Sequence, residues 1–238
     1  MKKALQFTIS FALFLMLAVA PAVAGEVIDG VVASVNRHPI LRSDWDEAVR
    51  FEALMQQKPV AGLTQADRIR ALQRLIDRHL LSAQMGDANY MRPSDEKLQE
   101  NITRLRAQLP NGKDDAAWQQ LLRSYGLDEQ TLEQHLSDEF QVMNFIEVRL
   151  RPNVHVNQEE VESYYKNQLI PDLQQNGGKV LAFDDVNSRI HELLTQQRID
   201  ELLDAWLHNL RQQAEIHTSI AIPGVNTPEE VGSAAGVN

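Results

Sequence analysis

The chain has no cysteine among its 238 residues, and this absence excludes several classes of protein at once. A disulfide framework is impossible, a thiol cannot serve as a nucleophile, and no lipid can be attached through a cysteine. Stability must therefore come from packing alone. A soluble chain of this length buries roughly 70% of its unfolded surface, which is enough for a core without covalent staples.

No apolar run of the length needed to cross a membrane is present. The run from Phe7 to Ala20 is shorter than the roughly 18 residues of a spanning helix, and two lysines precede it. Ala22 and Ala24 then form an A-x-A cleavage site. This order predicts a signal peptide over residues 1–24, cleaved after about Ala24. We expect a periplasmic mature protein without stable membrane insertion.

Positive charge is scarce. The chain carries 23 Lys and Arg against 33 Asp and Glu, and its net charge of −10 becomes −12 when the two lysines leave with the leader. The basic residues that remain do not gather into a stripe, so nucleic acid is not an expected partner. An acidic protein is also repelled by anionic lipid surfaces, which favours free diffusion over peripheral membrane binding.

Motifs of catalysis are missing as well. The sequence has no H-E-x-x-H pair, no G-x-S-x-G and no glycine-rich phosphate loop, so we expect no catalytic residue, no metal and no cofactor. The closest approach to a metal cluster is His135 with Asp138 and Glu139 on one helix. That grouping is more typical of a solvated helix face than of a metal site.

Helical periodicity dominates what is present. Apolar residues recur at spacings of three and four, and caps, glycines and prolines punctuate them. Helices are predicted at 43–57, 64–86, 94–109, 118–126, 128–150, from 157 onward, and at 186–210. Ser43 is the expected cap of the first, and Phe140 and Met143 are expected to point inward. Trp45, Trp118 and Trp206 fall on or near apolar stripes, as core anchors do.

Extended segments occur near both ends of the mature chain. Val27 to Val35 alternate as in a half-buried strand, and the turn NRHP leads to a second strand that starts at Pro39, which restricts it to a sheet edge. An isolated hairpin is marginal in water, so we expect it to pair with a strand in AEIHTSIAI. The two ends should therefore meet, and a disordered tail should follow over 221–238.

Four stretches carry a resemblance to a known family: VVASVNRHPILRSDWDEAV, RIRALQRLIDRHLLSAQMGDANYMRPSDEKLQENI, YGLDEQTLEQHLSDEF and VNQEEVESYY. In this order the chain resembles the N-terminal domain of SurA-like periplasmic chaperones from Val27 to Tyr165. The resemblance implies a helical peptide-binding module, similar in outline to trigger factor, whose hairpin pairs with a strand after a C-terminal helix. The segment from Asp184 to Ile220 is similar to that helix and strand.

The chain departs from the family pattern in two places. The family often has a glycine in the hairpin turn where this chain has His38, a residue type that tolerates positive φ. Parvulin-type prolyl isomerase domains normally separate the two halves of the family's chaperone core. Here only a short, weakly periodic segment stands between them. Folded domains rarely have fewer than about 50 residues, so no isomerase domain fits in this segment.

These observations predict a mostly α fold with a small antiparallel sheet made by the N-terminal hairpin and a C-terminal strand. We expect five segments: a signal peptide (1–24), a SurA-like N-terminal chaperone domain (25–170), a linker in place of an isomerase (171–183), a C-terminal helix and strand that complete the core (184–220), and the tail (221–238).

The resemblance implies an ATP-independent holdase that binds unfolded exported polypeptides, outer-membrane proteins among them, and lacks isomerase activity. Two adjacent tyrosines on one helix point about 100° apart, so one of them is expected to face a groove. Expected client-binding residues are Phe51, Met55, Met91, Tyr164 and Tyr165. A prolyl isomerase and a dedicated subunit of a secretion or envelope-assembly system are the alternatives, and a homo-oligomer is compatible with each.

Overall fold

The computed structural model describes residues 29–86, 92–109 and 112–222. The expected signal peptide with Ala22 and Ala24, and the candidate Met91, lie outside these residues.

A tight hairpin opens the described chain. Strands β1 (Val31–Val35) and β2 (His38–Leu41) are antiparallel, and Val35 pairs with His38. The two turn residues between them have positive φ, 49° at Asn36 and 68° at Arg37, as in a type I′ turn. His38, which stands where the family often has glycine, does not need positive φ, since it already belongs to β2.

The third strand of the sheet comes from the opposite end of the described chain. β3 (Ile216–Thr218) pairs antiparallel with β1, and the strand order is β2-β1-β3. Ser219 extends the pairing because its backbone N–H donates to the Val32 carbonyl at 2.9 Å. The predicted meeting of the two ends is confirmed, and Pro39 lies in an edge strand as its missing N–H requires.

A β-bulge at Val32 breaks the alternation expected of β1. The register places Val31 opposite Leu41 and Ala33 opposite Ile40, which leaves Val32 as the extra residue. As a result Val32 and Ala33 are both buried, whereas Val31, expected on the same apolar face as Ala33, is 54% exposed.

Helices make up most of the fold, so the predicted mostly α class with a small antiparallel sheet is confirmed. The longer ones are α2 (Arg42–Met55), α3 (Gln65–Met85), α4 (Asp95–Gln108), α5 (Asp115–Ser124), α6 (Glu129–Leu150) and α9 (Phe183–Gln213). Shorter helical segments are η1 (Val60–Gly62), η3 (Arg151–Asn153), α7 (Gln158–Tyr164), the π-helical turn η4 (Tyr165–Leu169) and α8 (Ile170–Gln175).

The N-cap of the first long helix lies two residues earlier than predicted. Leu41 is its N-cap, and the Leu41 backbone N–H donates to the Asp44 carboxylate at 3.1 Å. Ser43 is therefore not the cap. Its hydroxyl donates to the carboxylate of Asp29, which ties the start of α2 to the segment just before β1.

Two adjoining apolar clusters hold the body of the protein together. One packs α2 and α3 against the sheet around Ile40 and Leu72, and the other packs α2 against α4, α5 and α6 around Phe51 and Leu122. Trp45 and Trp118 are buried in them, as predicted for core anchors. Trp206 is half-buried and meets Phe145 with ring centroids 5.8 Å apart, where α6 and α9 cross.

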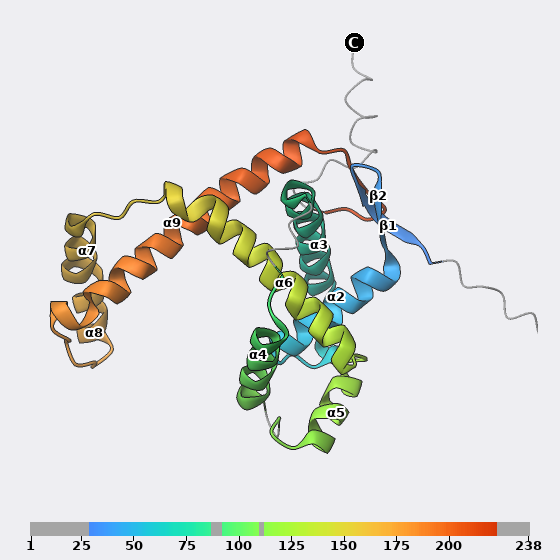
Figure 1. Ribbon diagram of the computed structural model, residues 1–238, viewed down its shortest axis with the longest axis horizontal. Coiled ribbons are helices and arrows are strands. Elements are labelled where there is room, and N and C mark those ends of the chain that lie inside the picture. The colour runs from blue at the N-terminus through green and yellow to red at the C-terminus, as the bar shows by residue number, and fades with distance from the viewer. Residues whose placement is uncertain (1–28, 87–91, 110–111, 223–238) are drawn as a thin grey trace, which may run out of the picture.

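An arm of residues 151–200 extends from this body (Figure 1). The α7–η4–α8 run lies at the far end of α9 from the sheet, and a small cluster around Val161, Val186 and Ile190 holds the two together. Arg151 joins α6 to α9 through Glu147 at 2.5 Å and Glu192 at 2.7 Å. Residues 171–175 of the expected linker belong to α8, so the connector is residues 176–182.

The C-terminal end of the described chain is packed. Ile222 is 4% exposed and belongs to the cluster beneath the sheet. The predicted boundary of the tail at residue 221 is therefore too early, because Ile222 is still packed. Residues 223–238 lie outside the described part of the chain. Every helix in that described part is too short or too polar to cross a bilayer.

Candidate functional site

An open groove lies on the body between α2, α4 and α6. We call it the body groove, and its volume is about 440 Å³. Its lining residues are Met55, Lys97, Asn101, Arg104, Leu105, Gln108, Leu136, Glu139, Phe140 and Met143. Of the residues expected from the sequence to bind clients, Met55 lines this groove.

The groove is apolar because the end of α2 and one side of α6 bring aliphatic and aromatic side chains to it without covering them. Met55, the last residue of α2, is 40% exposed, and Met143 of α6 is 55% exposed. Phe140 lies one turn before Met143 and is half-buried. Met143 was expected to point inward, and that expectation is wrong. Flexible thioethers at the surface of a groove adapt to side chains of different shapes.

Charged groups border this apolar surface. On α4, Lys97 Nζ lies 2.9 Å and Arg104 Nη2 lies 3.2 Å from the Glu100 carboxylate, and these cations lower the pKa of Glu100. On α6, desolvation raises the pKa of Glu139 although 44% of its side chain stays accessible, and Arg78 at 3.6 Å opposes that shift. The groove thus has a cationic edge on α4 and an anionic edge on α6.

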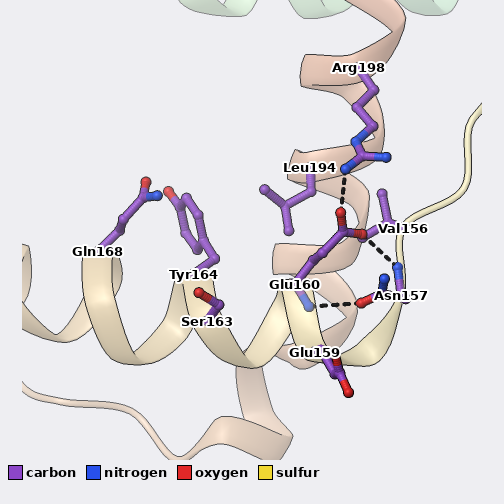
Figure 2. A pocket seen from close by; sticks show the side chains of 9 residues that line it. All are labelled: Val156, Asn157, Glu159, Glu160, Ser163, Tyr164, Gln168, Leu194 and Arg198. Atoms are coloured by element: carbon purple, nitrogen blue, oxygen red, sulfur yellow. Dashed lines mark hydrogen bonds and ion pairs between the residues drawn. The ribbon is translucent and has the colours of Figure 1, made fainter.

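A second groove lies on the arm, between α7 and α9 (Figure 2). Its volume is about 400 Å³. We call it the arm groove, and its lining residues are Val156, Asn157, Glu159, Glu160, Ser163, Tyr164, Gln168, Leu194 and Arg198. Tyr164 stands on one side of it and Leu194 on the other, with the ion pair of Glu160 and Arg198 beside Leu194.

The start of α7 holds that ion pair in place. Asn157 caps the helix by accepting from the Glu160 backbone N–H at 3.0 Å, and Glu160 accepts from the Asn157 backbone N–H at 2.8 Å. This second hydrogen bond, followed by the charge of Arg198, lowers the pKa of Glu160. Arg198 also donates to the His155 carbonyl at 2.9 Å, so the charged side chains of Glu160 and Arg198 already have partners within the chain.

The two adjacent tyrosines have different surroundings. Tyr164 faces the arm groove, as the helical geometry predicted for one of the pair. Tyr165 turns instead to the connector: its hydroxyl donates to the Leu181 carbonyl at 2.7 Å, and its ring meets Phe183 edge-on at 5.2 Å. Tyr165 therefore fastens the connector to α9.

Phe51 does not line either groove. It is 2% exposed and stacks on the His135 ring, with centroids 4.6 Å apart and planes at 16°. His135 was expected on a solvated helix face, but it is 9% exposed, and its Nε2 lies 2.8 Å from Glu47. It does not gather with Asp138 and Glu139, and among the described residues no three acidic or histidine side chains are placed to hold a metal.

A comparison with protein families decides what kind of module this is. The family model for the SurA-like N-terminal domain matches residues 1–146, more than half of the chain. The chain belongs to the SurA-like N-terminal domain family. That family is of chaperone type and periplasmic, and the domain itself is not catalytic. No curated protein matches the chain.

The SurA-like match includes most of the body and ends within α6. It therefore contains all the residues that line the body groove, from Met55 to Met143, whereas the arm groove lies beyond it. Within the described part of the chain, only the connector of residues 176–182 stands between α8 and α9, where the resemblance leads one to expect isomerase domains.

One residue of each groove is predictable from the sequence as a binding candidate. Met55 and Tyr164 are candidates from the sequence, whereas Leu105 is predicted on the apolar stripe of its helix, and Phe140 and Met143 are predicted to point inward. Their signal is present but ambiguous, because an apolar residue on a helix stripe is buried or exposed according to which partner helix covers it.

Proposed function

We propose that the protein is an ATP-independent holdase that binds unfolded exported polypeptides through the body groove and has no prolyl isomerase activity. The observation that carries this proposal is the open, apolar, methionine-bearing groove between α2, α4 and α6, inside the SurA-like part of the chain. Soluble proteins rarely leave such surfaces uncovered unless a partner uses them.

The body groove suits weak binding of segments that differ in sequence. A volume of about 440 Å³ accommodates a few side chains of an extended segment rather than a folded partner. Met55 and Met143 change rotamer at little cost, so segments of different sequence make comparable contacts. The net negative charge, −10 for the full chain and more negative without the leader, limits nonspecific association and keeps a complex with an apolar client in solution.

Two features support the choice of clients and compartment. The apolar leader with Ala22 and Ala24 is that of an exported protein, and the family is periplasmic. Unfolded polypeptides in transit through that compartment, outer-membrane proteins among them, expose the apolar segments that the groove accepts.

The test is light scattering from a denatured outer-membrane protein diluted into buffer with a near-stoichiometric amount of the mature protein. The wild-type protein should suppress aggregation, and Met143→Asp should lose most of that effect because a carboxylate then stands on the apolar surface. Val148→Asp is the matched control: it changes another exposed apolar residue of α6, 63% exposed and outside the groove, and should stay active.

Two results would contradict the proposal. If the wild-type protein leaves aggregation unchanged for both the outer-membrane protein and an unrelated unfolded protein, a dedicated subunit with one tight partner becomes the better reading. If Met143→Asp and Val148→Asp suppress aggregation equally well, clients bind elsewhere. A rate of prolyl cis/trans exchange that rises with protein concentration would contradict the absence of isomerase activity.

A further inference from the structure

Four of the five residues that α4 contributes to the body groove are hydrogen-bond donors or amides, and the fifth is Leu105. The four polar residues that α4 contributes to the groove are Lys97, Asn101, Arg104 and Gln108. They follow one another at intervals of four, three and four residues, so they form a single line along the helix. Lysine and arginine are donors only, and the two amides each offer an N–H₂ group.

The line has the length of a short extended peptide. From Lys97 to Gln108 the helix rises roughly 16 Å, at 1.5 Å per residue. An extended chain advances about 3.3 Å per residue, so about five residues of it fit alongside. The apolar surface formed by Leu105, Phe140 and Met143 lines the same groove and is available to the side chains of such a segment.

The internal contacts of this line leave donors available. Glu100 receives one contact from Lys97 Nζ at 2.9 Å and one from Arg104 Nη2 at 3.2 Å. Arg104 Nη2 also donates to Asn101 Oδ1 at 3.0 Å, which occupies the acceptor of that amide and not its N–H₂ group. Three donors on an ammonium and five on a guanidinium exceed these contacts. The side chains of Lys97 and Arg104 are 45% and 58% exposed, so a ligand reaches them.

We propose that this face of α4 binds the main chain of the client: donors among Lys97, Asn101, Arg104 and Gln108 bond to the backbone carbonyls, about two or three, that an extended segment of about five residues turns toward the helix, while its apolar side chains enter the groove. The inference rests on the proposed function and adds how the client is held. Every polypeptide offers the same carbonyls, so a donor line binds unfolded segments without selecting a sequence. Glu139 on the opposite edge repels carboxylate side chains and accepts from backbone N–H groups.

Paired substitutions separate hydrogen-bond donation from charge. Lys97→Gln with Arg104→Gln removes both charges and keeps a donor at each position, whereas Lys97→Met with Arg104→Leu removes charge and donors together. The ligand is a peptide of about eight residues with alternating leucine and serine, acetylated and amidated so that it is uncharged, with a neutral dye. Its dissociation constant is measured by fluorescence anisotropy, and thermal unfolding checks that both variants fold.

We expect the glutamine pair to bind within about threefold of the wild-type protein and the Met/Leu pair to bind about tenfold more weakly, the effect of two lost hydrogen bonds. Equal affinity of the Met/Leu pair and the wild-type protein would overturn the inference, and so would an equal loss in both pairs, which would indicate charge. If Met143→Asp still abolishes binding in those cases, the proposed holdase stands without the donor line. A wild-type protein that does not bind the peptide at all would overturn both.

Discussion

Replacing Ile222 tests whether the C-terminal end of the described chain is part of the core. Ile222 lies four residues beyond β3, is 4% exposed, and packs into the cluster that joins the sheet to α2 and α3. Ile222→Ala removes three carbon atoms from that cluster. Isoleucine to alanine changes at buried positions reduce the free energy of unfolding by about 2–5 kcal/mol, the sum of lost transfer energy and the cavity left behind.

For a folded body of this size, 1 kcal/mol shifts Tm by roughly 2–4 °C, so the lower end of this range corresponds to about 4–8 °C. Differential scanning calorimetry of the mature protein measures the shift. Val31→Ala is the matched control, because Val31 lies on β1 and is 54% exposed, and its change should stay below about 1 kcal/mol. If Ile222→Ala lowers Tm no more than Val31→Ala does, Ile222 is not part of the core.

Two further substitutions probe local interactions. Contacts from Lys58 and then Thr64 lower the pKa of Asp67, so its stabilising effect is present above the ordinary carboxyl pKa of about 4 and is lost as the pH falls below it. Asp67→Asn should therefore lower Tm at pH 6 and reduce the fall of Tm between pH 6 and pH 3. A fall of Tm as large as that of the wild-type protein would refute this. Arg37→Gly relieves a φ of 68° and should raise the unfolding free energy by roughly 0.5 kcal/mol in denaturant titrations, whereas Arg37→Ala should not.

Much of the fold follows from local signals. Thr64 caps α3 through Asp67 and Ser94 caps α4, as their side chains indicate, and proline at position 39 correctly marks an edge strand. The bulge at Val32 and the turn at Asn36 and Arg37 do not follow in this way. Both depend on how β1 meets its partners: asparagine favours the positive φ of position 36, but valine carries no preference for a bulge and arginine none for positive φ.

The candidate site was less predictable than the fold. Phe51 and Met143 are both apolar residues on helix stripes, yet Phe51 is 2% exposed and Met143 is 55% exposed. The difference arises because α4, α5 and α6 cover one part of α2, while no described helix covers the side of α6 that holds Met143. Periodicity identifies which face of a helix is apolar, but tertiary contacts decide which part of that face stays open.

The pairing of β1 with β3 also determines when the body can finish folding. Val35 and Ile216 are neighbours in the sheet although almost the entire described chain lies between them. The entropy of closing so long a loop must be offset before the contact contributes, and contacts of this kind slow folding. The hairpin emerges first during synthesis and is marginal by itself. The sheet of this chaperone-type protein is therefore complete only after its own last strand has been synthesised.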